Sequence, residues 1–399
     1  MIATMLWLIA AVLALPVMVL TIEVLAAFFL PDQDTNNPTA SHPPSKIRTT
    51  VLVPAHNEAS GIGHTLQQIM ADLPDNARVL VIADNCTDQT ADIARQNGAD
   101  VIERSHAELR GKGYALDHGI RHLAATPPDV VIIIDADCEV QTGSLKQLVS
   151  TCQASGRPVQ ATYLMHSPPG AATGLKVAEF AWLLKNRIRP DGLARLGLPC
   201  QLTGTGMAFP WSLLANCQLA TGELVEDMQL GIDLAEAGFP PVFESRALVS
   251  STFPTQATAQ ETQRTRWEHG HLGMIVRRFP GLLFSSLRQT DIRLLAMALD
   301  LGIPPLALLV TLQMADLAAN LLAMLVGVSG MEPITVNLTA LLSLVLSILL
   351  CQYKWAKHIL PISTLFYVPL YVLKRIPRHF RFLTHREKNW IRTNRGNDQ

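Results

Sequence analysis

The first 30 residues of the chain are almost wholly apolar, with Glu23 the only charged side chain among them. A helix of that length exceeds the roughly 20 residues needed to cross the hydrocarbon core of a bilayer. No Lys or Arg precedes the apolar run and no clear small-x-small cleavage site follows it, which favours a membrane-spanning helix over a cleaved signal peptide. Composition agrees, because 49% hydrophobic and only 16% charged residues is too apolar for an ordinary soluble enzyme of 399 residues.

Two further apolar runs lie toward the C-terminus, at Pro304–Val328 and Ile334–Cys351. Both reach the length of a membrane-spanning helix, the second only just. The run Ile359–Val372 is shorter and contains two prolines, so it is expected to lie in the membrane interface or to form a re-entrant piece. The sequence therefore predicts three membrane spans.

Basic residues beside these runs predict the orientation of the chain. Lys46 and Arg48 follow the first span, Lys354 and Lys357 follow the last, and residues 329–333 between the second and third spans contain no Lys or Arg. Lys and Arg gather on the cytoplasmic side of a membrane, so the N-terminus is expected outside and the region after the first span inside. This predicts a multi-pass protein of the bacterial inner membrane whose central region is cytoplasmic.

The C-terminal tail is basic, although the whole chain has a formal net charge of only -1 at pH 7. Between residues 374 and 395 there are eight Lys or Arg residues against a single acidic residue, Glu387. Such a tail suits anionic membrane lipids, with a simple solvated tail as the alternative. The nearly neutral net charge gives no overall attraction to nucleic acid, which is not an expected partner.

Short β-branched runs alternate with helical segments between Arg48 and about Phe253. This alternation is typical of βαβ units around a mostly parallel sheet and predicts an α/β domain over residues 48–272. Strands are expected at Thr49–Pro54, Arg78–Ala83, Asp100–Arg104, Val130–Asp135 and Val159–Met165, with helices near Gly61–Leu73, Thr87–Asn97, Gly111–Ala124 and Ser144–Gln153. The rest of the chain then divides into a span over 1–30, a linker over 31–47, an interfacial segment over 273–303, two spans within 304–352, and an interfacial segment with the basic tail over 353–399.

The six cysteines form no CxxC pair and no close cluster with histidines. Neither a zinc site nor a disulfide framework is indicated. They are expected to be reduced thiols.

The strongest chemical signal is Asp135-Ala136-Asp137, which follows an apolar run expected to be a central strand. Alternate strand residues face the same side, so the two carboxylates are expected to converge on one divalent cation, Mg²⁺ or Mn²⁺. Ligands bind open α/β sheets at the carboxyl ends of their strands, which favours this interpretation. A turn or a helix-capping pair is the alternative.

Three weaker signals lie where a nucleotide site would need them. Val53–Glu58 ends the first strand and Ile82–Asn85 ends the second, so carboxylates stand at two strand tips, where they can bind a ribose or a base. Gly111–Leu116 opens a helix with a basic, flexible turn whose backbone N–H groups and Lys112 ammonium can meet an anion. Each alone is routine turn or cap chemistry.

Two motifs lie further along the chain. Asp227, at the start of an expected helix over Met228–Ala237, is either a helix cap or a general base that takes a proton from an acceptor hydroxyl. Gln263, Arg266 and Trp267 share one helical face by their spacing, where Gln and Arg can grip a pyrophosphate and the indole can support a sugar ring. A membrane-proximal helix with an interfacial Trp is the alternative for these three.

Taken together, these motifs resemble the family 2 glycosyltransferases of the GT-A fold, in the membrane-bound, cellulose-synthase-like and polysaccharide-assembly branch. The resemblance covers about residues 48 to 272. It rests on seven patches in the same order, among which Gly204-Thr205-Gly206-Met207 lies between the acidic pair and Glu226-Asp227. Any one patch is weak, and their order makes the set specific.

The resemblance implies an inverting transfer of a sugar, expected from a UDP-sugar, to a lipid-linked or polysaccharide acceptor. It places Asp84, Asp135 and Asp137 among the nucleotide and metal carboxylates, and Pro54, Glu58 and Lys112 near the nucleotide-sugar donor. Asp227 matches the catalytic base, and Gln263, Arg266 and Trp267 match the QxxRW element that closes over donor and acceptor.

Three alternatives stay open from the sequence. A processive polysaccharide synthase is disfavoured, because three spans are fewer than an enzyme with its own polymer channel usually has. A nucleotidyltransferase shares the sheet and the metal carboxylates, but it needs neither membrane spans nor a base such as Asp227. A non-catalytic nucleotide-sugar sensor could lose Asp227, whereas this chain has it.

Overall fold

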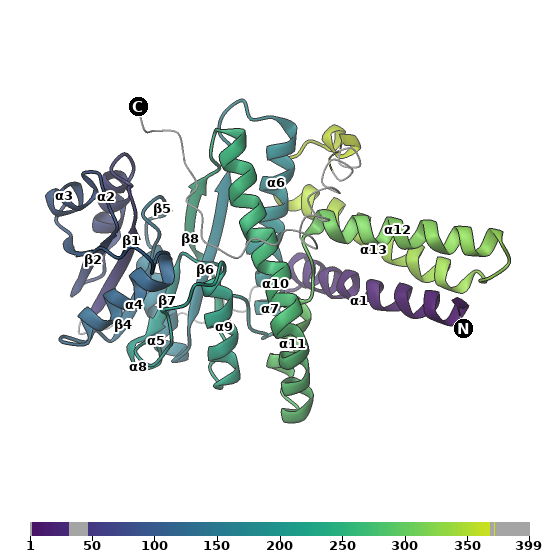
Figure 1. The fold of residues 1–399 in the computed structure, drawn as a ribbon, viewed down its shortest axis with the longest axis horizontal. Coiled ribbons are helices and arrows are strands. Elements are labelled where there is room, and N and C mark those ends of the chain that lie inside the picture. Colours follow the sequence, from purple (N-terminus) through teal and green to yellow (C-terminus); the bar gives the residue numbers. More distant parts are fainter. Residues whose placement is uncertain (1, 32–46, 368–370, 372–399) are drawn as a thin grey trace. The chain divides into compact units, whose positions relative to one another are not determined.

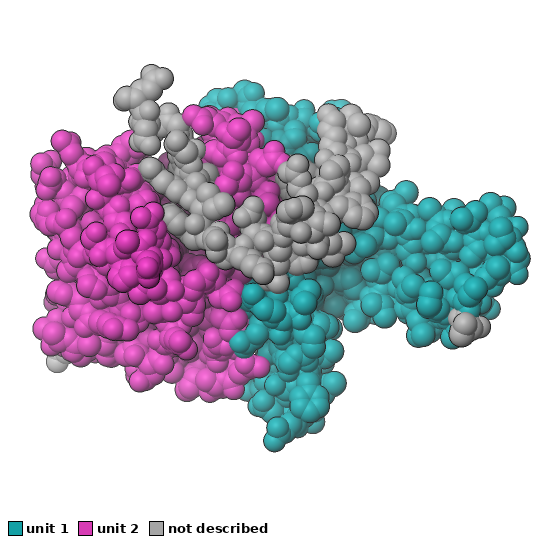
Figure 2. Space-filling model, viewed as in Figure 1, with its two compact units in different colours: residues 1–31, 169–198, 271–387 teal, residues 32–168, 199–270, 388–399 magenta. Residues whose placement is uncertain are grey.

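A computed structural model describes residues 2–31, 47–367 and 371. Its contacts divide the chain into two compact units, which Figure 2 shows in different colours. Unit 1 comprises residues 1–31, 169–198 and 271–387, and unit 2 comprises residues 32–168, 199–270 and 388–399. The predicted α/β domain is one continuous stretch, whereas unit 2 leaves out residues 169–198. The predicted linker and basic tail lie outside the described residues, apart from the linker's two ends.

Unit 2 is built on one eight-stranded sheet with the order β3-β2-β1-β4-β7-β6-β8-β5 (Figure 1). The neighbours β1–β2, β1–β4, β2–β3 and β6–β8 are parallel, and β4–β7, β6–β7 and β5–β8 are antiparallel. The strands are β1 Thr49–Ala55, β2 Ala77–Asp84, β3 Asp100–Arg104, β4 Val130–Ile133, β5 Glu139–Val140, β6 Val159–His166, β7 Met207–Pro210 and β8 Val242–Thr252.

The five expected strands are confirmed, and three further strands were missed. The sheet is mostly parallel, as predicted, but it also contains the antiparallel strand β7, which lies between β4 and β6, and the antiparallel edge strand β5. β7 follows directly on a Gly-Thr-Gly turn and is only four residues long, and β5 has two residues. β8 contains the charged residues Glu244 and Arg246, which hide its strand character in a sequence scan.

Helices α4, Lys112–Leu123, and α9, Glu226–Glu236, contribute to one hydrophobic core with the sheet. Alternate residues of β2 and β4, such as Leu80 and Ile133, point into this core together with Leu116 and Leu230. Burying each such side chain stabilises the fold by about 1.5–3 kcal/mol. Unit 2 also contains α2 Ile62–Asp72, α3 Thr90–Gln96, α5 Ser144–Ser155 and α8 Trp211–Leu214.

In the part of unit 1 that the structure describes, three helices are long and apolar enough to cross a membrane, as the sequence predicts: α1 Ile2–Phe29, α12 Leu306–Leu325 and α13 Glu332–Trp355. The described part of the expected interfacial run Ile359–Val372 includes a short 3₁₀ helix, Ile362–Tyr367. Shorter elements complete the unit: α6 Thr173–Leu183, a π-helical turn Leu184–Ile188, α7 Arg189–Arg195 and α11 Ile292–Leu301. Helix α10, Ala257–Gln289, begins in unit 2 and ends in unit 1.

Candidate active site

The acidic pair lies on a turn just beyond the central strand. β4 ends at Ile133, and the backbone N–H of Cys138 closes the turn by donating to Asp135 O at 3.1 Å. The carboxylates converge because of this turn, and the expected strand alternation through Asp135 is wrong. One ligand atom from each of Asp135, Asp137 and Cys138 lies within 4.8 Å of the others.

Cys138 is the member of this group that the sequence did not indicate. Its side chain is buried beneath the two partly exposed carboxylates. Burial, and then the charges of Asp137 and Asp135, raise the pKa of the Cys138 thiol well above its usual range. The exposed ligands at this turn are therefore carboxylate oxygens.

Asp135 is held from two sides. Its backbone N–H donates to Thr205 Oγ1 at 3.0 Å, and its carboxylate accepts from the Lys112 ammonium. Lys112, the first residue of α4, also donates to Gly204 O at 2.6 Å. The acidic turn, the N-terminus of α4 and the Gly-Thr-Gly turn before β7 therefore meet in one place.

Asp227 joins this group through Gly204. A methyl group on Gly204 would lie 3.3 Å from Asp227 Oδ2 and 3.8 Å from Lys112 Nζ. Gly204 has a φ of +95°, a conformation that side chains rarely adopt, so glycine fits both the backbone and the space here. The sequence-predicted residues Lys112 and Asp227 thus lie beside one glycine, and Asp135 joins them through its ion pair with Lys112.

Charge balance at this centre shifts two pKa values. Desolvation opposes the charge of Lys112, but Asp135, Glu226 and Asp227 outweigh it and raise the Lys112 pKa. Desolvation and then the like charge of Asp227 raise the pKa of Glu226 to about 7. Lys112 therefore stays an ammonium ion, and the charge of Glu226 changes near neutral pH.

Asp84 has a partner that the sequence did not indicate. It ends β2 opposite Arg104 of β3, and the Arg104 guanidinium donates to its carboxylate. Asn85 Nδ2 also donates to Asp84 at 3.1 Å, and the Arg104 guanidinium lies 5.7 Å from the centre of the Tyr114 ring. Only the strand register brings Asp84 and Arg104 together, so no sequence spacing could have revealed the pair.

Two other predicted residues lie at the end of β1 and in the loop that follows it. Pro54 lies within β1, and Glu58 lies in the loop, where its backbone N–H donates to Thr90 Oγ1 at 2.8 Å. His56 Nδ1 lies 2.7 Å from Asp84 O. These bonds tie the loop to the end of β2 and the start of α3, along the same edge of the sheet.

Gln263, Arg266 and Trp267 lie on α10 as their spacing predicts. Gln263 is buried, whereas the other two are partly exposed. A methyl group on Gly270 of the same helix would lie 2.7 Å from Val225 Cγ1. The end of this motif region therefore packs closely against the residue that precedes α9.

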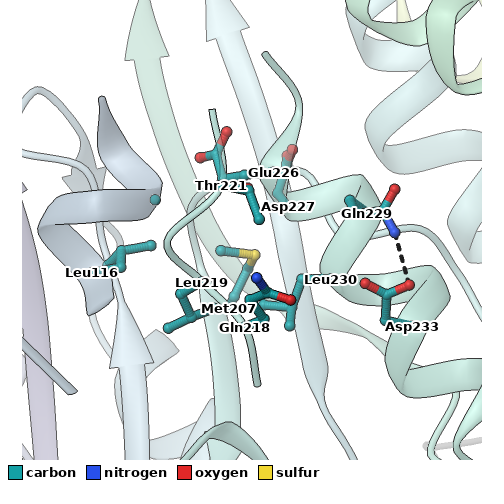
Figure 3. Close-up of a pocket in the computed structure, with 11 residues that line it drawn as sticks. Leu116, Met207, Gln218, Leu219, Thr221, Glu226, Asp227, Gln229, Leu230 and Asp233 are labelled. Atoms are coloured by element: carbon teal, nitrogen blue, oxygen red, sulfur yellow. Dashed lines mark hydrogen bonds between the residues drawn. The ribbon is translucent and has the colours of Figure 1, made fainter. Parts of the chain in front are cut away.

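A pocket opens beside Asp227, between α4, β7, the loop around residues 218–221 and α9 (Figure 3). Its lining comes from unit 2 alone: Gly113, Leu116, Met207, Gln218, Leu219, Thr221, Glu226, Asp227, Gln229, Leu230 and Asp233. Asp227, the expected base, therefore belongs both to this pocket and to the charged group that contains Lys112.

A family model described as glycosyltransferase like family 2 matches residues 44–270, more than half of the chain. The chain belongs to glycosyltransferase family 2. This membership confirms the predicted enzyme class and sets aside the nucleotidyltransferase and the non-catalytic sensor. The matched region contains every site residue named above.

Two known glycosyltransferases are similar to this chain in sequence. An uncharacterized glycosyltransferase of Mycobacterium tuberculosis is 34% identical over 197 residues, which cover 44% of this chain and 82% of the relative. A 4,4'-diaponeurosporenoate glycosyltransferase of Staphylococcus aureus is 31% identical over 112 residues, which cover 27% of this chain and 28% of that enzyme.

A solved mannosyltransferase from Pyrobaculum calidifontis, in complex with GDP-Man and Mn²⁺, superposes with a TM-score of 0.57. The match covers 96% of this chain and 100% of that protein, at 19% sequence identity. At that identity the likeness shows the fold alone, and it confirms the predicted GT-A architecture.

Proposed function

We propose that the protein transfers a sugar from a nucleotide-diphosphate donor to an acceptor hydroxyl, with inversion at the anomeric carbon. The observation that carries this proposal is that Lys112 pairs with Asp135 and lies with Asp227 beside Gly204. Within one site, a cation can stabilise the charge of the departing diphosphate, and a carboxylate pair can assist it. A potential base in the same site can remove the proton of the acceptor hydroxyl.

Asp227 is the proposed general base. Its carboxylate is partly exposed at the first turn of α9, so it can reach a bound hydroxyl. It would take the proton as the hydroxyl oxygen attacks the anomeric carbon from the face opposite the diphosphate. Lys112 would hold its ammonium against the negative charge of the diphosphate. Gln263, Arg266 and Trp267 are proposed to close over the donor and acceptor.

Asp135 and Asp137 are proposed to hold a divalent cation. Two partly exposed carboxylates on one turn offer the oxygen ligands that Mg²⁺ and Mn²⁺ prefer, so the residues fit such an ion. A bound cation would neutralise charge on the leaving nucleotide. The Mn²⁺ in the mannosyltransferase of similar fold supports this assignment, and the GDP-Man bound to that enzyme supports a nucleotide-sugar donor. For this chain we propose a UDP-sugar as the donor.

Purified protein should release nucleotide from at least one sugar donor when Mn²⁺ or Mg²⁺ is present, and excess chelator should stop the release. Asp137→Ala should abolish it without unfolding the protein, because Asp137 lies on a partly exposed turn. A screen of UDP- and GDP-sugars, with and without an extracted lipid acceptor, tests both points. Undiminished turnover in chelator would remove the metal from the proposal.

The membrane role is also a proposal. Lys354 of α13 donates to Ala27 O and Phe28 O of α1 at 3.2 and 3.0 Å, and its ammonium lies 4.6 Å from the centre of the Trp355 ring. A cation among aromatic rings at helix ends suits the interface on the cytoplasmic side of the inner membrane. The acceptor is then proposed to be lipid-linked or a growing polysaccharide, reached at that face.

Reporter fusions test this orientation. A reporter after Gln399 should behave as cytoplasmic, and one inserted near Glu332, at the start of α13, should behave as external. An external C-terminal reporter would require a fourth span and reverse the proposed position of the tail.

A further inference from the structure

The ammonium group of Lys112 binds one of the two proposed cation ligands. It donates to the Asp135 carboxylate and to Gly204 O, the latter at 2.6 Å. One ligand atom of Asp135 and one of Asp137 lie within 4.8 Å of each other, which is close enough for one ion to reach both. Lys112 is therefore bonded to the same carboxylate that a divalent cation on this turn would use.

A divalent cation and the Lys112 ammonium would repel each other at Asp135. The Lys112 and Asp135 side chains are partly buried, so water screens their charges less than it does at the protein surface. Asp135, Glu226 and Asp227 also stabilise the ammonium, so Lys112 does not lose its proton to relieve the repulsion. The ammonium must instead move away from Asp135 before a cation binds there tightly.

The position of Lys112 allows this movement. It is the first residue of α4, and its side chain is partly exposed. A lysine carries its charge at the end of a flexible four-carbon chain, which can turn to another acceptor without a change in the backbone. A nucleotide diphosphate carries more negative charge than one carboxylate, and it is the partner already proposed for this ammonium. A bound diphosphate would therefore draw the ammonium away from Asp135.

We propose that Lys112 competes with the divalent cation for Asp135: it occupies this carboxylate in the donor-free protein and releases it when a nucleotide diphosphate binds. Donor and cation then bind cooperatively, each raising the affinity of the other by the same factor. Lys112 is a positioning residue in this respect, because it acts on the cation through Asp135. The inference rests on the proposed transferase function, which it deepens by linking the binding of the donor to that of the cation.

Mn²⁺ binding to the purified full-length protein tests this competition. It is measured without nucleotide, from the electron paramagnetic resonance signal of free Mn²⁺. Lys112→Met keeps a long side chain and removes its charge, so it should bind Mn²⁺ about tenfold more tightly than the wild-type protein. Lys112→Gln is a second neutral variant that should show the same gain, and thermal unfolding in detergent reports which variants are folded.

Two controls separate competition at Asp135 from a general effect of charge. Arg110→Met removes a positive charge at an exposed position two residues from Lys112, and it should change the Mn²⁺ affinity by less than about twofold. In an Asp135→Asn background, Lys112→Met should raise the Mn²⁺ affinity by less than about threefold, because the carboxylate for which the two cations compete is absent.

The same titrations with saturating UDP, and separately with GDP, test the link to the donor. A protein-free titration accounts for the Mn²⁺ that these nucleotides bind in solution. At least one nucleotide should raise the Mn²⁺ affinity of the wild-type protein about tenfold more than that of Lys112→Met, because only the wild-type protein has an ammonium to be drawn away from Asp135.

Several results would overturn the inference. One is equal Mn²⁺ affinity of Lys112→Met and the wild-type protein without nucleotide, and another is the same gain in Arg110→Met or in the Asp135→Asn background. It is also overturned if neither nucleotide favours the wild-type protein over the variant, or if no protein binds Mn²⁺. These titrations need no turnover. A protein that binds Mn²⁺ as expected but releases nucleotide from no sugar donor would contradict the transferase function instead, so the two failures are distinguishable.

Discussion

Two groups of charged side chains, one in each unit, differ in how far they are exposed. In unit 2, the side chains of Lys112 and Asp135 pair while remaining 19% and 30% exposed. In unit 1, Arg189 of α7 binds Glu23 of α1 and Asp300 of α11, and the exposed fractions are 7%, 1% and 8%. One group of charges is open to a ligand, and the other is enclosed by protein.

This difference separates reactive charges from structural ones. Arg189 donates to Glu23 Oε2 at 2.7 Å and to both the carboxylate and the backbone oxygen of Asp300, so three helices share one guanidinium. A charge paired in this way has little capacity left for a substrate. Partial exposure therefore distinguishes the Lys112–Asp135 pair of the candidate active site from the enclosed Arg189 group.

Asp227→Asn should show the largest effect on activity and a small effect on stability. The substitution keeps size but removes basicity, so kcat should fall by about 10²–10⁴-fold. Stability should change by less than about 1 kcal/mol, because Asp227 is partly exposed in the first turn of α9. Transfer rates, donor affinity by calorimetry and thermal unfolding in detergent measure all three.

The matched variant is Asp84→Asn, which changes a buried carboxylate that Arg104 holds. It should weaken donor binding and leave turnover at saturating donor largely unchanged. If Asp227→Asn instead loses donor affinity and keeps its turnover, Asp227 is a helix cap or a donor contact and not the base.

Arg189→Ala should affect stability much more than activity, the opposite of Asp227→Asn. Removing the guanidinium leaves Glu23 and Asp300 as buried, unpaired carboxylates, which costs about 3–5 kcal/mol of stability. Arg187→Ala, two residues away at an exposed position, should cost no more than about 0.5 kcal/mol. Thermal unfolding in detergent compares them, and equal melting temperatures would show that the buried group does not stabilise unit 1.

The sequence revealed the elements whose patterns are local. The apolar runs identified α1, α12 and α13, and the β-branched runs identified β1 to β4 and β6, because both signals depend only on neighbouring residues. It also placed Asp135 and Asp137 together, although a turn brings them together rather than a strand. Strands β5, β7 and β8 carry weak local signals and depend on their partners in the sheet.

Contacts between residues far apart in the chain could not be predicted from such local patterns. Arg104 meets Asp84 through strand register, and Arg189 meets Glu23 although 166 positions separate them. Neither pair has a spacing that distinguishes it from other charged residues. Candidate site residues were therefore recognisable by motif order, whereas the residues that pair with them needed the fold.

Helix α10 begins in unit 2 and ends in unit 1, and it has a glycine in each part, Gly270 and Gly281. Gly281→Ala adds a methyl group where nothing lies within 4 Å, so it should stabilise the protein by about 0.5–1 kcal/mol and leave activity unchanged. Gly270→Ala gains the same helix propensity but places its methyl group 2.7 Å from Val225 Cγ1.

Val225 is buried and immediately precedes α9, so its displacement should shift the start of the helix that carries Asp227. Overpacking of this kind costs about 1–3 kcal/mol, which exceeds the propensity gain and leaves Gly270→Ala less stable by about 1 kcal/mol. Because the proposed base, Asp227, moves with α9, kcat should also fall several-fold while donor affinity is retained. Thermal unfolding and transfer rates of the two variants decide the matter. If Gly270→Ala is as stable and as active as Gly281→Ala, then the close packing of α10 on Val225 does not position Asp227, and the active site of unit 2 tolerates movement at the start of α9.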